Sequence, residues 1–323
     1  MTERREETDY FIAEVNVSAV ILEDNTTQAS KTFEILTQSI QRISKLNKIK
    51  ILPLGRTIKQ TRAEVEKLMS EENKVPDWVL CDVDLSDKGA GVEVAKTILK
   101  RKYPTDVLLY TQSLVFPVVE DIQSNRYCNV ATANRDQLDG AIDILVWRSV
   151  TRLADPDYLR GIMLSRAAET ESLIDECLVQ LFGVNKIQTQ LRDSFRWGLL
   201  RSEGYGQSVK FKVLNDFLKD RLQNGSDPKV IFTTNELSTI KGNLERIFKT
   251  RNIVAHGIAY SDEKGGLVIL NRMRRGDADG NSSQDYTENI KRDEIKQYLH
   301  LCYLTEEGLR KLLTFLVNKS DWS

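Results

Sequence analysis

The chain has 323 residues, of which 41% are hydrophobic, and this length predicts two domains that each bury a core. Its 46 basic and 47 acidic residues nearly cancel, so the chain has no overall positive charge that would attract a polyanion. Any contact with RNA therefore has to be made by a local basic patch. Four scattered cysteines without CxxC spacing argue against a zinc site or a disulfide framework. No apolar run is long enough to span a membrane, so we expect a soluble, cytoplasmic protein.

Short β-prone runs alternate with amphipathic helices in the first half of the chain, after a polar lead-in at residues 1–15. Strands are predicted at residues 17–22, 49–52, 78–81 and 107–110, and helices at residues 27–46, 58–69, 92–102 and 134–152. Alternation at these lengths predicts an α/β domain over residues 16–153, built on a doubly wound parallel sheet.

Acidic side chains and a hydroxyl follow three of these strands. Glu23 and Asp24 follow the first, Asp82 and Asp84 the third, and Thr111 the fourth. The carboxyl ends of parallel strands converge on one crevice, so we expect these side chains to lie together. Carboxylates at one sheet edge are hard oxygen ligands for Mg²⁺ and can serve a phosphoryl group. Alternatively, each acidic residue merely caps a strand end that faces solvent.

The joint order of these motifs resembles the receiver domain of two-component response regulators, over about residues 16–150. Residues 20–24 (VILED) resemble its first strand with the acidic pair, residues 78–85 (WVLCDVDL) the strand with the phosphoacceptor, and residues 108–111 (LLYT) the strand with the switch hydroxyl. The resemblance implies a five-stranded sheet, phosphorylation of Asp82 by a histidine kinase or another phosphodonor, Mg²⁺ in the acidic pocket, and Thr111 as the switch hydroxyl.

The sequence departs from the receiver pattern at the fifth strand. That pattern has a Lys seven residues before the Leu of the last helix, and counting back from Leu138 reaches Ala131, with no Lys nearby. Since this Lys normally pairs with the acceptor carboxylate and the phosphoryl group, its loss is expected to weaken the readout of phosphorylation. The alternative is a degenerate receiver that serves as a dimerisation or docking surface.

A mainly helical domain is predicted over residues 157–323. Its boundary lies at residues 154–157, where Asp155 can cap a helix and Pro156 fits the first helical turn. Helices are predicted at residues 158–182, 187–200, 210–222, 235–256 and 293–317, with a small hairpin formed by residues 258–260 and 266–273.

The end of the helix predicted at residues 235–256 holds Arg251, Asn252 and His256, and the chain has only two histidines. Asn252 and His256 lie four residues apart on one flank, whereas Arg251 falls within the apolar stripe, where it needs a partner. The helix C-terminus favours the imidazolium form of His256, which suits a proton donor or an oxyanion partner. Alternatively, Arg251 is paired with a carboxylate and His256 simply ends the helix.

The stretch from Arg251 to His256 resembles the Arg-x4-His signature of the HEPN superfamily, in a region that covers about the last half of the chain. The resemblance implies a bundle of four to five helices that forms a homodimer in which two motifs face one groove. It also implies a metal-independent endoribonuclease that needs no cofactor and leaves 2′,3′-cyclic phosphate ends. By the same resemblance, Arg251, Asn252 and His256 are the catalytic candidates.

Two further sets of residues are candidates for the RNA site. Glu171, on the helix predicted at residues 158–182, is the candidate acid that orients the Arg or the His. Arg272, Arg274 and Arg275 form a basic cluster that can contact the RNA backbone or can be a solvated loop edge. The leading hypothesis is a ribonuclease controlled by a receiver-like domain. The alternative is a non-catalytic HEPN scaffold that binds RNA, a nucleotide or a protein; no motif for specific DNA binding is seen.

Overall fold

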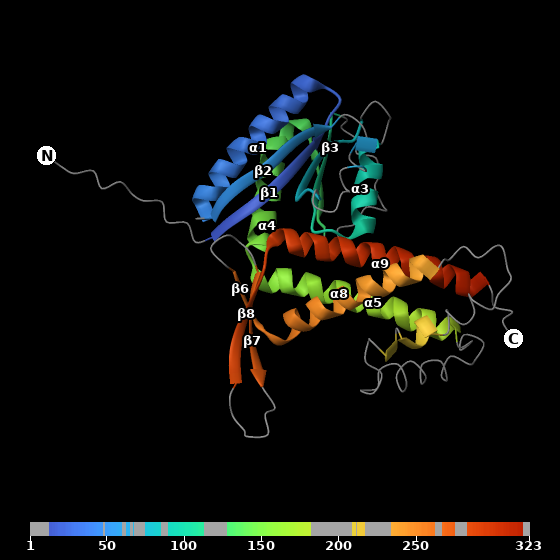
Figure 1. Cartoon of the computed structure of the whole chain (residues 1–323). Coiled ribbons are helices and arrows are strands. Elements are labelled where there is room, and N and C mark those ends of the chain that lie inside the picture. Colours follow the sequence, from blue (N-terminus) through green and yellow to red (C-terminus); the bar gives the residue numbers. More distant parts are fainter. Residues whose placement is uncertain are drawn as a thin grey trace, which may run out of the picture. The chain divides into compact units, whose positions relative to one another are not determined.

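A computed structural model describes the chain over most of its length (Figure 1). The described residues are 13–47, 49–59, 63–64, 67, 75–84, 90–112, 128–181, 209–210, 212–216, 234–261, 267–274 and 283–318. The chain divides into two compact units. The first unit comprises Met1–Arg160 and Ile258–Gln297, and the second comprises Gly161–Gly257 and Tyr298–Ser323.

A five-stranded parallel sheet is the centre of the first unit. Its strands are β1 (Ala13–Leu22), β2 (Ile49–Lys59), β3 (Trp78–Asp82), β4 (Asp106–Thr111) and β5 (Val130–Asn134). Their order in the sheet is β2-β1-β3-β4-β5, and all four pairings are parallel. This is the strand order of flavodoxin-like sheets, and it agrees with the predicted α/β class.

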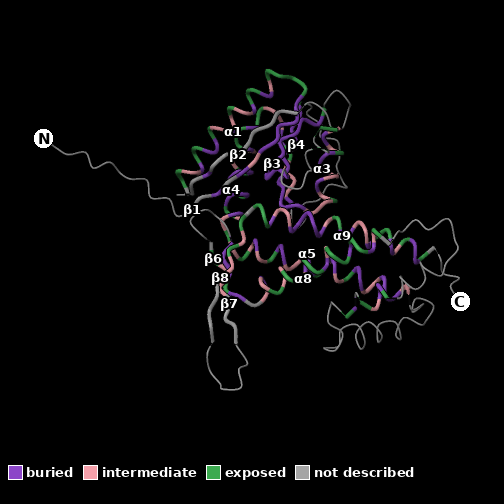
Figure 2. Tube along the Cα trace, in the orientation of Figure 1, coloured by how far each residue is buried: buried purple, intermediate pink, exposed green. Residues whose placement is uncertain are grey.

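Helices cover both faces of this sheet. They are α1 (Thr26–Asn47), α3 (Ala90–Arg101), the short 3-10 helix η1 (Arg135–Gln137) and α4 (Leu138–Leu153). Helices α1 and α4 are joined by Arg42, which donates to Asp143 at 2.6 Å and to Asp139 at 3.3 Å, while α3 lies on the other side of the sheet (Figure 1). Strands β3 and β4 are therefore buried along their whole length (Figure 2).

The first turn of α3 lies directly on the end of β3, because Gly91 has no side chain. A Cβ atom on Gly91 would stand 2.2 Å from the carbonyl oxygen of Asp82 and 2.8 Å from the sulfur of Cys81. The variant Gly91→Ala is expected to lower the free energy of unfolding by about 1–3 kcal/mol, as overpacking does. Urea unfolding measures this, with Gly140→Ala as the matched control, since a Cβ at Gly140 meets nothing within 4 Å. Equal effects of the two substitutions would contradict this packing.

Two strands are longer than the sequence predicted. Strand β1 begins at Ala13, inside the predicted lead-in, and β2 continues to Lys59 instead of ending at residue 52. The start of the helix predicted at residues 58–69 is therefore wrong, and most of its remainder lies outside the described residues. Strand β2 is the edge strand, where Pro53 is tolerated because one side of the strand needs no partner.

Three long helices follow the sheet in the chain. They are α5 (Pro156–Leu181), α8 (Thr234–His256) and α9 (Arg292–Asn318), and residues 209–210 and 212–216 are also helical. The amide of Asp157 donates to the carboxylate of Asp155 at 2.9 Å, which confirms Asp155 as the predicted cap of α5. The helix predicted at residues 187–200 lies outside the described residues. Within the described part of the chain, no helix is long and apolar enough to cross a membrane.

Helices α5, α8 and α9 share one hydrophobic core in the second unit. Its fully buried members include Ile174, Cys177 and Leu178 of α5, Leu237 and Leu244 of α8, and Leu309 and Leu312 of α9. The hydroxyl of Tyr298 donates to the carbonyl of Met163 at 3.0 Å and joins α9 to α5. These contacts agree with the predicted helical second domain.

A three-stranded antiparallel sheet belongs to the first unit. It consists of β6 (Ile258–Ser261), β7 (Leu267–Arg274) and β8 (Ser283–Ile290), in the order β6-β7-β8. The predicted hairpin is confirmed by the pairing of β6 with β7. Strand β8 was not predicted, because its sequence is polar. It forms because all eight of its residues pair with β7.

Buried ion pairs hold the amino ends of β3 and β4 in the first unit. The ammonium of Lys296, near the start of α9, donates to the carboxylate of Asp77 at 3.0 Å and to the carbonyl of Val75 at 3.1 Å. Arg152, near the end of α4, pairs with the buried carboxylate of Asp106. The end of α4 and the start of α9 are thereby anchored to the same edge of the parallel sheet.

All four cysteines are free and buried. Burial raises the pKa of the Cys177 and Cys302 thiols to about 12, so both thiols stay protonated at pH 8. Because the thiolate is the nucleophile, iodoacetamide at pH 8 is expected to label the folded protein at least about 100-fold more slowly than the protein in urea. Mass spectrometry of each cysteine checks this, and fast labelling of either thiol in the folded chain would contradict it.

Candidate functional site

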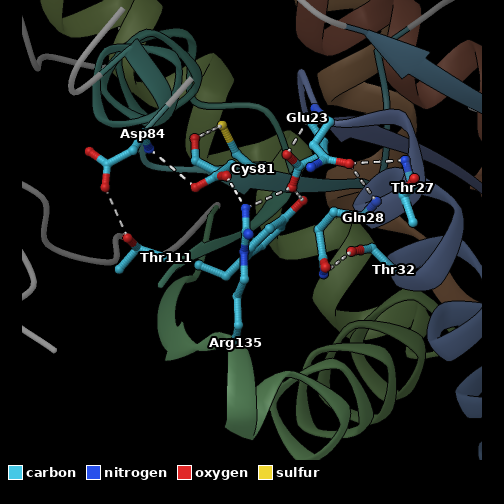
Figure 3. A network of polar contacts seen from close by, with 11 residues as sticks. Glu23, Thr27, Gln28, Thr32, Cys81, Asp84, Thr111 and Arg135 are labelled. Atoms are coloured by element: carbon cyan, nitrogen blue, oxygen red, sulfur yellow. Dashed lines mark hydrogen bonds and ion pairs between the residues drawn. The ribbon is translucent and has the colours of Figure 1, made fainter. Parts of the chain in front are cut away.

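Four parallel strands bring polar side chains to one edge of the first unit's sheet. Glu23 follows β1, Asp82 ends β3, Tyr110 and Thr111 end β4, and Arg135 follows β5. Because the carboxyl ends of parallel strands lie at the same edge, residues from 23 to 135 meet in one network of polar contacts, which we call the acidic pocket (Figure 3). The acidic cluster predicted from the sequence is therefore present at the predicted edge.

Three of the predicted ligands form a group that fits a divalent ion. Glu23, Asp24 and Asp82 each offer a carboxylate oxygen, and these atoms lie within 4.8 Å of one another. Hard oxygen donors of this kind suit Mg²⁺. Asp84, the fourth predicted ligand, does not belong to this group. Its exposed carboxylate accepts a hydrogen bond from the hydroxyl of Thr111 at 3.1 Å instead.

The predicted switch hydroxyl reaches the phosphoacceptor candidate through an intermediate residue. The hydroxyl of Thr111 bonds to the carboxylate of Asp84, and the backbone amide of Asp84 donates to Oδ1 of Asp82 at 3.2 Å (Figure 3). The arrangement places a hydroxyl within two hydrogen bonds of the Asp82 carboxylate.

Arg135 supplies a cation to this cluster, although Ala131 stands where the receiver pattern has its Lys. It follows β5 directly, and its terminal nitrogen Nη2 lies 3.3 Å from Oε2 of Glu23 and also pairs with Oδ2 of Asp82. Arg135 was not predicted, because the receiver pattern has its Lys four positions earlier, at residue 131. The available signal was an Arg immediately after the fifth strand, where a side chain can turn into the pocket.

Glu23 is the most enclosed carboxylate of the pocket. Burial raises the pKa of its carboxyl, the amide of Asn25 lowers it, the charge of Asp82 raises it, and Arg135 lowers it. The hydroxyl of Tyr110 donates to Oε2 of Glu23 at 3.1 Å. Burial raises the pKa of Tyr110 far above its ordinary value, so this hydroxyl remains a hydrogen-bond donor. The protein thus surrounds a buried carboxyl group with its own hydrogen-bond donors.

The second candidate site is the end of α8 in the second unit. Arg251 is partly exposed, and its Nη1 donates to Oδ1 of the exposed Asn252 at 3.0 Å. Arg251 is therefore not enclosed in the core, although it falls within the predicted apolar stripe. His256 ends α8, and Gly257 follows it as predicted. The side chain of His256 lies outside the described part of the chain.

Glu171 forms an ion pair with Lys210 at 3.1 Å. Lys210 is buried and also pairs with Asp175 at 2.9 Å. This arrangement could not be predicted, since Lys210 lies on a different segment from Glu171 and Asp175. The role of Glu171 as an orienting acid therefore stays a prediction.

The backbone of two of the candidate RNA-binding arginines lies in the antiparallel sheet of the first unit. In the backbone register of β7 and β8, Arg272 lies opposite Asp285 and Arg274 lies opposite Ser283. The side chains of Arg272 and Arg274, and the whole of Arg275, lie outside the described residues.

Comparison with known proteins adds little to this description. No family model matches the chain, and no curated protein matches it. One similar solved structure is a trimeric coiled-coil segment of yeast Spc42 fused to another structure. It shares 18% identity over 43% of this chain and 78% of its own, with a TM-score of 0.32. A likeness at that level supports no inference about fold or function.

Proposed function

We propose that this protein is a signal-regulated, metal-independent endoribonuclease, in which the pocket around Asp82 controls the motif at the end of α8. The observation that carries the proposal is the accessibility of the Arg251 and Asn252 side chains. Arg251 and Asn252 are hydrogen-bonded to each other at the accessible end of a helix that otherwise packs in a core. A guanidinium held at the surface can meet a phosphate.

The proposed chemistry is attack of an RNA 2′-hydroxyl on the adjacent phosphorus. The 2′ oxygen forms a bond to phosphorus, the bond from phosphorus to the 5′ oxygen breaks, and the products are a 2′,3′-cyclic phosphate and a 5′-hydroxyl. His256 would take the 2′ proton or protonate the leaving oxygen. Arg251 would stabilise the charge on the phosphorane, and Asn252 would orient the phosphate or the His. Two protomers would each contribute one motif to a shared groove.

The first unit would receive the signal at Asp82. A carboxylate oxygen of Asp82 would attack the phosphorus of a phosphohistidine or a small acyl phosphate while the bond to the donor breaks. Glu23, Asp24 and Asp82 would hold Mg²⁺, which supplies neutralisation of phosphoryl charge when bound. Arg135 is close enough to follow the change in charge at Asp82, which supports a readout even though the expected Lys is absent.

The test is incubation of the purified full chain with a mixed single-stranded RNA in EDTA. The proposal predicts cleavage, with fragments that carry 2′,3′-cyclic phosphate and 5′-hydroxyl ends. Cleavage that appears only with added Mg²⁺, or fragments with 5′-phosphate ends, would overturn the metal-independent mechanism. Pre-treatment with Mg²⁺ and a small phosphodonor covers the case in which the unphosphorylated first unit holds the nuclease inactive.

A non-catalytic scaffold is the second candidate function. The observation that favours it is the ion pair between Glu171 and Lys210, because the acid expected to orient the motif has another described partner. The scaffold predicts that the full chain binds RNA, a nucleotide or a protein without changing it. Binding of the mixed RNA with no cleavage under either condition would select this candidate.

A further inference from the structure

The guanidinium of Arg135 lies between the two buried carboxylates of the acidic pocket. The side chain of Glu23 is 0% exposed and that of Asp82 is 5% exposed, while that of Arg135 is 17% exposed. One terminal nitrogen, Nη2, contacts both carboxylates. The pocket therefore holds a cation that belongs to the chain itself.

Every carboxylate oxygen of these two residues already has a donor from the protein. On Glu23, Oε1 accepts from the amide of Asn25 at 3.2 Å, and Oε2 accepts from Tyr110 and Arg135. On Asp82, Oδ1 accepts from the amide of Asp84, and Oδ2 accepts from Arg135. The buried part of the acidic group is thus hydrogen-bonded without an external ion.

A divalent ion that binds both Glu23 and Asp82 would compete with this guanidinium, because Arg135 contacts one oxygen of each carboxylate. Mg²⁺ binds carboxylate oxygens at about 2.0–2.1 Å and demands near-octahedral geometry. An ion bound to Oε2 of Glu23 and Oδ2 of Asp82 would stand against the Nη2 atom that now contacts both, and two positive charges would repel across a pocket of low dielectric.

We propose that Arg135 is the resident cation of the pocket and that a divalent ion binds only by displacing its guanidinium. While Arg135 contacts Glu23 and Asp82, the pocket does not bind Mg²⁺. Arg135 opens η1, which leads directly into α4, so displacement of the guanidinium acts on the start of that helix. A regulatory role for this displacement rests on the proposed function. The competition between Mg²⁺ and the Arg135 guanidinium depends only on Glu23, Asp82 and Arg135.

The test is thermal unfolding of the full chain in EDTA and in a series of MgCl₂ concentrations at constant ionic strength. Wild type is compared with Arg135→Gln and with Arg135→Met, which keeps the length of the apolar stem. We expect the melting temperature of the wild type to change by less than about 1 °C up to 10 mM Mg²⁺. Both variants should melt lower in EDTA, and Mg²⁺ should raise their melting temperature by at least about 3 °C.

The Asp82→Asn substitution supplies the control, since combining it with Arg135→Gln should remove the response to Mg²⁺. A variant that folds only in MgCl₂ also supports the proposal. Equal Mg²⁺ responses of wild type and both variants, or no response in either variant, would overturn it. Failure of both variants to fold with or without Mg²⁺ would assign Arg135 a purely structural role and would overturn it as well. None of these readouts involves RNA or phosphorylation, so this proposal and the proposed function can fail separately.

Discussion

The variant His256→Ala is expected to cleave RNA in EDTA at least about 100-fold more slowly than the wild type. Proton transfer by a positioned side chain contributes about 10²–10⁴-fold to a rate, and the proposed chemistry has no other group for this step. Arg251→Ala should cause a loss of similar size, because a positioned cation stabilises the charge that develops on the phosphorane. Initial rates on one defined RNA, with product ends identified, measure both effects.

Arg246→Ala is the matched control for this prediction. Arg246 is an exposed arginine on the same helix as Arg251, five residues before it, so its loss removes an equal charge from α8 without touching the motif. It should retain nearly the wild-type rate. If Arg246→Ala and Arg251→Ala reduce cleavage equally, general electrostatic attraction of RNA explains the loss, and the catalytic role of Arg251 is contradicted.

The variant Arg166→Ala is expected to lose about 3–5 kcal/mol of stability, because it removes one partner of a buried ion pair. Arg166, on α5, is 0% exposed, and its Nη1 lies 2.8 Å from Glu169 and 2.8 Å from Glu306 of α9. Its removal leaves the buried carboxylate of Glu306 without this counter-charge in the core of the second unit. Urea unfolding followed by circular dichroism measures the loss.

Two further variants separate the effect of a buried charge from the effects of packing and of an exposed ion pair. The double variant Arg166→Met with Glu306→Leu removes the two buried charges, keeps the volume filled and leaves only the more exposed Glu169, so it should recover most of the lost stability. Lys241→Ala breaks an exposed pair with Glu245 and should change stability by no more than about 0.5 kcal/mol. A loss in the double variant as large as in Arg166→Ala would contradict the role assigned to the buried charge.

The parallel sheet could be predicted because its strands carry their own signal. Trp78–Asp82 and Asp106–Thr111 are nearly continuous apolar runs, and both are buried on the two faces of the sheet. The long β2 and the polar β8 could not be predicted in the same way. Pro53 and Gly55 interrupt the first, and polar residues fill the second, so pairing with a neighbouring strand decides their conformation.

The same distinction applies to the residues of the candidate sites, since some are placed by the strand order and others depend on distant partners. Glu23, Asp24 and Asp82 could be found because the topology of a doubly wound sheet brings strand ends together. Arg135 could be found only by its place directly after the fifth strand, since its partner Glu23 lies 112 residues away in the chain. Lys210 could not be found, because its partner Glu171 lies 39 residues away and no strand end marks its position. The tertiary structure alone reveals that Lys210 is an internal cation.

Control of the α8 motif by the Asp82 pocket is tested by the rate of RNA cleavage before and after treatment with Mg²⁺ and acetyl phosphate, in the wild type and in Asp82→Asn. Excess EDTA is added before the RNA, so that Mg²⁺ is available only during phosphorylation. We expect treatment to change the wild-type rate at least several-fold and to leave the rate of Asp82→Asn unchanged. An identical response of the two proteins, or no response in either, would contradict control of the α8 motif by the Asp82 pocket.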